Sequence, residues 1–216
     1  MTLSALTDSP AFGASPAPHH PLVERLSGHI RKLGPADRDA VVQHLLTLDP
    51  LSRFMRFGGV VSENALVRHA ARVVSNQAQA IGYFVEGELR AVAELHPLDR
   101  RSGKPATAEA AFSVERPWQG KGIGTALMQH LVLLAQNRGI EELQVVFLSN
   151  NGRMRSLAVQ HAADLRLDDK EMVGRMRPPQ ATVFSRIREV LGDIFSLIAS
   201  AFELQQRMLP PHLRGN

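Results

Sequence analysis

The segment QGKGIGT at residues 119–125 constrains this chain more than any other feature of its sequence, because three glycines alternate in it. It lies between a segment with the apolar alternation of a strand and a longer one with the apolar periodicity of a helix. Glycine permits positive φ and lets a ligand approach the backbone closely. The first N–H groups of a helix have no partner inside it, and the helix dipole adds positive potential there. The turn is therefore a candidate site for phosphate groups.

Two familiar phosphate-binding motifs do not fit this segment. The Walker A loop, G-x-x-x-x-G-K-[ST], is absent. A dinucleotide fingerprint, G-x-G-x-x-G, that started at Gly120 would need a glycine where Thr125 stands. The pattern that remains is Q/R-x-x-G-x-G/A, which Gln119, Gly122 and Gly124 satisfy. A glycine-rich turn without a ligand is the alternative, and the position between a strand and an amphipathic helix argues against it.

The composition excludes several classes of protein. The 216 residues include no cysteine, which rules out disulfides and thiolate catalysis. No apolar run reaches the roughly 20 residues that span a membrane, and the N-terminus lacks the pattern of a signal peptide. The formal net charge of +4, with one Trp and one Tyr, argues against a nucleic-acid partner and suits an anionic cofactor. We therefore expect a cytoplasmic protein without a transmembrane segment.

The sequence divides into three parts. Residues 1–27 are rich in Ala, Ser and Pro, and we expect a disordered N-terminal tail. Two adjacent histidines in this tail stand alone, so we expect no metal site. Residues 28–177 carry the strand and helix patterns of one α/β domain. Residues 178–216 are expected to form an amphipathic helix over 182–207 and a short tail.

The order of elements in the domain predicts an α/β (α+β) fold with a mixed central sheet flanked by helices. Asp49 and Pro50 are expected to end the first helix, so that a loop follows. The predicted strands cover residues near 30–33, 80–85, 89–95, 107–115, 142–148 and 166–176. The predicted helices cover residues 36–48, 62–74, 122–137 and 151–163.

The apolar stripe of the terminal helix would extend for roughly 40 Å at 1.5 Å per residue. Three partners are open for it: the chain's own domain, a second copy in a homodimer, and a membrane surface or other partner. Its polar face carries both signs of charge, which weakens the membrane alternative.

Several segments together carry a resemblance to a known family. Residues 50–57 (PLSRFMRF) and 151–158 (NGRMRSLA) flank a central pair, 108–114 (AEAAFSV) and 118–124 (WQGKGIG). Over residues 28–177 the chain resembles the GNAT N-acetyltransferase superfamily, and in particular the GNAT domain of bacterial protein lysine acetyltransferases. The glycine segment is specific for the superfamily, whereas the flanking segments are moderately specific for the subgroup.

The resemblance implies the GNAT fold, with the sheet splayed between its fourth and fifth strands and acetyl-CoA bound there as cosubstrate. It places the backbone of Phe112, Ser113 and Val114 beside the pantetheine arm. It places on the pyrophosphate the N–H groups of Gln119, Gly120, Lys121, Gly122, Ile123, Gly124 and Thr125. It also places Asn151 and Arg153 on the far side of the cofactor, and Asn151 suits the N-cap of its helix.

Acetylation of an amine needs a base, because a substrate ammonium must lose a proton before it attacks the thioester. Glu109 is the first candidate, since it lies in an otherwise uncharged predicted strand with small neighbours on its own face. Its spacing to Gln119 also matches the base of the lysine-acetylating relatives. Glu94 on the neighbouring strand is the second candidate and His96 the third. An exposed glutamate paired with an arginine is the structural alternative for Glu109.

Other positions depart from the family pattern or leave two interpretations open. Many GNAT enzymes protonate the leaving thiolate with a tyrosine, but here Ala158 stands at that position and Tyr83 lies on an early strand. The lysine-acetylating relatives also lack that tyrosine, so either water donates the proton or no acid is needed. Arg53 and Arg56 are expected in a loop on the acceptor side, where they would bind an acidic acceptor or form salt bridges.

These observations favour an enzyme that transfers acetyl from acetyl-CoA to a primary amine, on a protein lysine or a small molecule, by direct attack. The alternative is a non-catalytic acyl-CoA-binding sensor that signals through the terminal helix. The two differ in whether any amine is acetylated, since both require the cofactor to bind.

Overall fold

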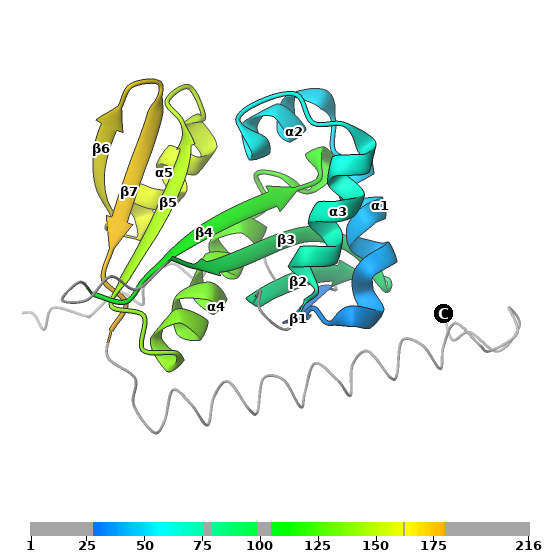
Figure 1. The fold of residues 1–216 in the computed structure, drawn as a ribbon, viewed down its shortest axis with the longest axis horizontal. Coiled ribbons are helices and arrows are strands. Elements are labelled where there is room, and N and C mark those ends of the chain that lie inside the picture. The colour runs from blue at the N-terminus through cyan, green and yellow to red at the C-terminus, as the bar shows by residue number, and fades with distance from the viewer. Residues whose placement is uncertain (1–27, 76–78, 99–104, 162, 180–216) are drawn as a thin grey trace, which may run out of the picture.

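The computed structural model describes residues 28–75, 79–98, 105–161 and 163–179. These residues form a seven-stranded mixed sheet with helices on both faces, and its strands follow the order β1-β2-β3-β4-β5-β7-β6 (Figure 1). The predicted mixed sheet flanked by helices is therefore confirmed. The predicted N-terminal tail and terminal helix lie outside the described residues. Within those residues, no helix combines the length and apolar character needed to cross a bilayer.

The first four strands form the antiparallel half of the sheet. They are β1 (Gly28–Lys32), β2 (Gln79–Val85), β3 (Glu88–Pro97) and β4 (Thr107–Val114). Glu86 and Gly87 join β2 to β3 and have positive φ angles of 51° and 72°. Positive φ at both central residues is what a type I′ hairpin turn requires.

The remaining strands form the other half of the sheet. They are β5 (Glu142–Leu148), β6 (Asp164–Asp168) and β7 (Glu171–Met176). β7 lies between β5 and β6 and pairs antiparallel with both.

The two halves meet along a short parallel contact between β4 and β5. Their pairing begins at Thr107 and Glu142 and ends at Ala110 and Val145. Beyond these residues the strands diverge, and the gap between them widens toward the C-terminal ends of both strands (Figure 1). Such a splay leaves backbone groups on the inner edge of each strand without a strand partner.

Helices cover both faces of the sheet (Figure 1). The α-helices are α1 (Arg38–Thr47), α2 (Pro50–Phe57), α3 (Glu63–Val73), α4 (Ile123–Asn137) and α5 (Gly152–Gln160). Two short 3-10 helices are η1 (Pro35–Asp37) and η2 (Arg116–Trp118).

Each face of the sheet has its own apolar core. On one face α4 buries Leu127 and Leu131 in a cluster that also includes residues of β3, β4, β5 and α5. On the other face α1 and α3 bury Val41, Leu45 and Leu66 against β2 and β3. The 3.6-residue spacing of these apolar positions explains why the helix predictions here succeeded.

The prediction of a loop after the first helix is wrong, because residues 50–57 form the helix α2. Asp49 is its N-cap: one carboxylate oxygen accepts the Ser52 N–H at 3.1 Å and the other accepts the Ser52 hydroxyl at 2.6 Å. Pro50 occupies the first helical position, where its missing N–H costs nothing. The Asp-Pro pair therefore starts a second helix as well as following the first.

The single strand predicted over 166–176 is also wrong, because this segment forms the hairpin of β6 and β7. Asp169 makes the turn with φ of 53°. A non-glycine residue at positive φ is uncommon, although aspartate tolerates it better than most residues. The turn therefore lacks the glycine that would have indicated it.

Candidate active site

A pocket of about 320 Å³ lies where β4 and β5 separate. Its wall is formed by β4 from Glu109 to Val114, by Gln119, by the residues that start α5 and by the inward face of α2. α2 contacts both β4 and β5, and it lies near the C-terminal end of β4 at the opening of the splay (Figure 1). The pocket therefore joins the glycine segment to the strand that carries the predicted base.

Two hydrogen bonds at the ends of β4 show which of its residues face β3. The Leu98 N–H donates to the Thr107 carbonyl at 2.9 Å, and the Glu115 N–H donates to the Arg90 carbonyl at 3.1 Å. In an antiparallel pair, alternate residues direct their backbone groups to the same neighbour. The odd-numbered residues of β4 therefore pair with β3, and the even-numbered residues face β5.

The divergence of β5 leaves Phe112 and Val114 facing the pocket, because strand pairing stops at Ala110. The Val114 carbonyl accepts a hydrogen bond of 2.8 Å from the side-chain amide of Gln119. The N–H groups of Phe112 and Val114 point into the gap. They can donate to an extended ligand that lies along β4, as the resemblance implies.

The glycine segment has the backbone geometry of an anion site. Gly120 and Gly122 have φ of 74° and 81°, a left-handed conformation that favours glycine. Gly122 is the N-cap of α4 and no side chain caps this helix end. The first N–H with a helical acceptor is that of Ala126, which donates to the Gly122 carbonyl at 3.0 Å. The N–H groups of residues 123–125 are therefore open to an anion.

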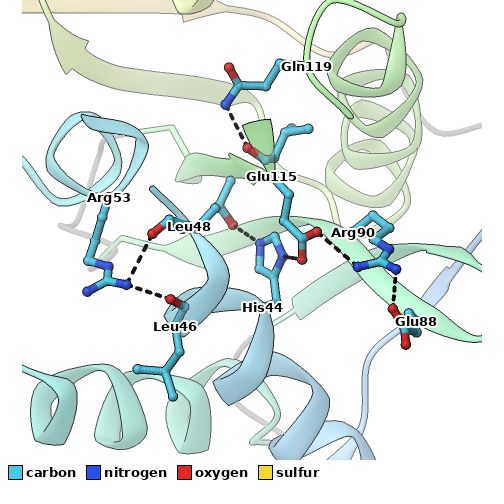
Figure 2. Close-up of polar contacts among 10 residues, drawn as sticks. His44, Leu46, Leu48, Arg53, Glu88, Arg90, Glu115 and Gln119 are labelled. Carbon is cyan, nitrogen blue, oxygen red and sulfur yellow. Dashed lines mark hydrogen bonds and ion pairs between the residues drawn. The ribbon is translucent and has the colours of Figure 1, made fainter. Parts of the chain in front are cut away.

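Gln119 does not join this array as predicted. Its N–H donates to the Arg116 carbonyl at 3.3 Å, within the loop. Its side chain instead links three elements, since it donates to the Ser52 hydroxyl at 3.0 Å as well as to the Val114 carbonyl. Gln119 thus holds the glycine segment against α2 and β4, and its contact with β4 is drawn in Figure 2.

Basic residues gather around Trp118 beside the glycine segment. The Lys121 ammonium lies 4.9 Å from the centre of the Trp118 ring, and the Arg90 guanidinium lies 5.7 Å from it. These distances are those of cation–π contacts. Lys121 directly precedes the start of α4 in the sequence, whereas Arg90 is paired with Glu88 and Glu115.

The start of α5 forms the opposite wall. Asn151 is the N-cap of this helix, and its side-chain oxygen accepts the Met154 N–H at 3.2 Å. The predicted capping role of Asn151 is therefore confirmed. Arg153 lines the pocket and is exposed. The Thr125 hydroxyl donates to the Gln160 side chain at 3.3 Å, which connects α4 to α5.

Glu109 lies in the pocket wall, half-buried, on the face of β4 away from α4. The side chains of β4 alternate between the two faces of the sheet. Ala108 and Ala110 pack in the core under α4, whereas Ser113 contacts a residue of α1 on the opposite face. Its partner in the β3 register is His96. Glu109 forms no ion pair or side-chain hydrogen bond with any other described residue.

Glu94, the second predicted base, is 1% exposed and enclosed by basic partners. It accepts from Arg56 at 2.6 Å, from His96 at 2.9 Å and from His69 at 3.1 Å. Burial raises the pKa of Glu94, but Arg56 and the two histidines outweigh burial and hold the pKa well below 4.5. A carboxylate stabilised in this way is a poor proton acceptor.

Arg53 and Arg56 lie on α2 and not in a loop, which corrects their predicted position. Arg53 donates to the carbonyl oxygens of Leu46 and Leu48 at 2.8 and 3.2 Å, and so joins α2 to the end of α1 (Figure 2). Arg56 binds Glu94. Both guanidinium groups thus have partners inside the protein, in agreement with the salt-bridge alternative for Arg56.

A buried polar group that the sequence analysis did not identify lies behind β4. His44 of α1 contacts Ser113 at 2.8 Å and Glu115 at 3.3 Å, and Arg90 donates to Glu115 at 3.2 Å (Figure 2). His44 stands beside the apolar stripe of α1, and that position alone gave no sign of its partners.

The position of the family's tyrosine is filled by Ala158, which is fully buried in the core.

The comparisons with known proteins agree with this geometry. The model of the acetyltransferase (GNAT) family matches residues 52–160. Acetyltransferase PA5475 of Pseudomonas aeruginosa is 30% identical over 134 residues, which are 59% of this chain and 70% of that protein.

Solved structures share the fold at low sequence identity. The GNAT domain of S. lividans PAT has a TM-score of 0.61 and 20% identity, with 68% of this chain and 89% of that chain covered. YncA of Salmonella typhimurium with acetyl-CoA has a TM-score of 0.56 and 15% identity, with 73% and 97% covered. A splayed sheet, a glycine turn that opens a helix and a family match over half of the sequence lead to one conclusion. This chain belongs to the GNAT acetyltransferase family.

Proposed function

We propose that this acetyltransferase transfers the acetyl group of acetyl-CoA to a primary amine, on a protein lysine or a small molecule. Glu109 serves as the general base. Acetyl-CoA as cosubstrate is supported by the family and by solved relatives described with coenzyme A or acetyl-CoA.

The residues of the pocket fit an extended anionic thioester. The uncapped start of α4 offers the N–H groups of residues 123–125 to a pyrophosphate. The N–H groups of Phe112 and Val114 suit the amide groups of a pantetheine arm. Arg153, on the exposed rim, adds a positive charge that suits a phosphate.

The observation that carries the role of Glu109 is its lack of a charged partner among the described residues. Glu94 and Glu115 lie nearby, and each is bound by an arginine. An arginine contact favours the ionised carboxylate and opposes its protonation. Glu109 is therefore the carboxylate of this pocket that is best placed to accept a proton.

Acetyl-CoA supplies an acyl group that is activated as a thioester. Glu109 accepts a proton from the substrate ammonium, directly or through one water, and so makes the amine nucleophilic. Its position beside Ala111 leaves room for a substrate next to the carboxylate. The open N–H groups of β4 fix the thioester arm, so that the amine meets a positioned carbonyl.

Glu109→Gln tests the assignment, because glutamine keeps the size of the side chain but cannot accept the proton. We expect kcat to fall by about 100-fold or more, with little change in the KM for acetyl-CoA. Glu63→Gln is a matched control, since Glu63 is exposed in the first turn of α3. Steady-state rates with lysine peptides, polyamines and aminoglycosides provide the measurement. A Glu109→Gln enzyme as fast as the wild type would exclude Glu109 as the base.

The same amine panel separates catalysis from the non-catalytic alternative. A chain that binds acetyl-CoA in calorimetry but acetylates no amine would be an acyl-CoA sensor. A chain that binds no CoA at all would contradict both functions.

A further inference from the structure

Ser113 of the pocket wall and two buried side chains behind it form an ordered series of hydrogen bonds. The hydroxyl of Ser113 lies 2.8 Å from Nε2 of His44, and Nδ1 of His44 lies 3.3 Å from a carboxylate oxygen of Glu115. A nucleophile, a base within hydrogen-bond reach and a third group that orients the base are the parts of an activated serine.

Two further contacts fix the donor and acceptor roles in this series of hydrogen bonds. Arg90 donates to the second carboxylate oxygen of Glu115 at 3.2 Å and also contacts Glu88 (Figure 2). The carboxylate is thereby held as an acceptor for the N–H at Nδ1 of His44. Nε2 is then left to accept the hydroxyl proton of Ser113.

Burial of these polar groups is costly, and the hydrogen bonds among them offset that cost. The side chain of His44 is fully buried and that of Glu115 is 5% exposed. The inward neighbours of His44 on α1 are Val41 and Leu45, so an apolar side chain would fit the same environment. Buried polar groups of this kind are frequent at functional sites, where they set the protonation of a reacting group.

Ser113 also has the right surroundings for acyl transfer. It belongs to the pocket wall at the splay of β4 and β5. The open N–H groups of Phe112 and Val114 lie on either side of it in the strand. An arm of acetyl-CoA that is held by these N–H groups would lie beside Ser113.

We propose that Ser113 is an acylatable nucleophile, activated by His44 and Glu115, that gives this chain a thioester hydrolase activity beside amine acetylation. This inference rests on the proposed binding of acetyl-CoA but not on the proposed amine acceptor.

The reaction balances without any further reagent. The Ser113 oxygen forms a bond to the acetyl carbon as His44 takes the hydroxyl proton, the carbon–sulfur bond breaks, and His44 returns the proton to the sulfur of CoA. A water then attacks the seryl ester, with His44 taking its proton and returning it to Ser113. The products are CoA and acetic acid.

The experiment uses the full chain with acetyl-CoA and no amine. The chain has no cysteine, so a thiol-reactive dye reports only the CoA that is released. Acid quenching followed by peptide mass spectrometry locates any added acetyl group. We expect one acetyl group on Ser113 and steady release of CoA.

Two variants and one control test whether His44 activates Ser113. Ser113→Ala removes the nucleophile, and His44→Gln keeps hydrogen-bonding groups but cannot carry the proton, so each should lower CoA release by about 100-fold or more. Ser156→Ala, at an exposed serine of α5, should match the wild type. Circular dichroism checks the fold of each variant, and the nearly isosteric Ser113→Ala suffices if His44→Gln unfolds.

The outcomes separate this inference from the proposed function. If Ser113 carries no acetyl group and Ser113→Ala leaves CoA release unchanged, Ser113 is not the nucleophile, even if the protein acetylates amines. If Ser113 is acetylated equally fast in a folded His44→Gln variant, His44 does not activate Ser113. If Ser113 is acetylated but no amine is, the result supports Ser113 as a nucleophile. It then contradicts only the amine acceptor of the proposed function.

Discussion

Replacement of Arg56 by methionine should destabilise this protein strongly at neutral pH. Methionine keeps most of the buried stem but removes the guanidinium that contacts Glu94 at 2.6 Å. Arg56 is 11% exposed and Glu94 is 1% exposed, so little water can replace the lost contact. The substitution therefore leaves a buried carboxylate with only two histidines as partners.

The size of the effect follows from this arrangement. Removal of one partner of a buried ion pair costs about 3–5 kcal/mol. His69 and His96 still contact Glu94, so we expect the lower end, about 3 kcal/mol. With a urea m-value of about 2 kcal/mol per molar, the unfolding midpoint should fall by about 1.5 M.

The pH dependence has a definite sign. The pKa of Glu94 in the folded protein lies well below 4.5, so its ionised form stabilises the fold at every pH above that value. This contribution is lost as the pH falls through the folded pKa, where Glu94 takes up a proton. The penalty of Arg56→Met should therefore be full at pH 7 and smaller in acid, because a neutral Glu94 does not need the guanidinium.

Urea unfolding at several pH values, followed by circular dichroism, provides the assay. Arg56→Met/Glu94→Leu is the matched control, since it removes the buried charge together with its partner. We expect this double variant to be more stable than Arg56→Met alone. A penalty below about 1 kcal/mol at pH 7, the range of exposed pairs, would refute the reasoning, as would a penalty that grows in acid.

Two further substitutions, Gly120→Ala and Asp49→Ala, test local features of the site, and Gly139→Ala is the control for the first. Gly120→Ala should cost about 1 kcal/mol because its φ is 74° and a methyl group there meets no neighbour, and it should weaken CoA binding in calorimetry. Gly139→Ala, with φ of 66° and equally open space, should cost the same while CoA binding stays at the wild-type level, and equal affinity in both variants would contradict this. Asp49→Ala should lower the unfolding free energy by about 1 kcal/mol through loss of the α2 N-cap. The hydrogen bond from the Ser52 hydroxyl outweighs burial and lowers the pKa of Asp49 below 3.8, so this loss should shrink in acid, and a loss independent of pH would exclude the carboxylate cap.

Local sequence signals predicted the part of the fold that carries the glycine segment. The strand over 142–148 agrees with the prediction to the residue, and the helix that follows the segment agrees within one residue. These elements have period-2 or period-3.6 apolar patterns with clear ends. α2 was missed because Asp49 and Pro50 fit the end of one helix as well as the start of another.

Such local signals could not predict which side chains contact each other. Arg56 and Glu94 are 38 positions apart, and His44 and Ser113 are 69 positions apart. Their contacts depend on how α1 and α2 pack on the sheet, and periodicity in one sequence does not encode that packing. Arg56 consequently received a substrate-binding role, and His44 received none.

These contacts are the reason why we propose Glu109, and not Glu94, as the general base. Glu94 and Glu109 lie on neighbouring strands and on the same face of the sheet, with His96 bonded to the first and in register with the second. Arg56 on α2 stabilises the charge of Glu94, whereas Glu109 has no charged partner among the described residues. Because the same arginine anchors α2 over the splay, the contact that shapes the pocket also removes Glu94 from proton transfer. Loss of the contact between Arg56 and Glu94 is therefore expected to lower the stability of the fold and to make Glu94 a better proton acceptor at the same time. A substitution of Arg56 alone cannot separate these two effects.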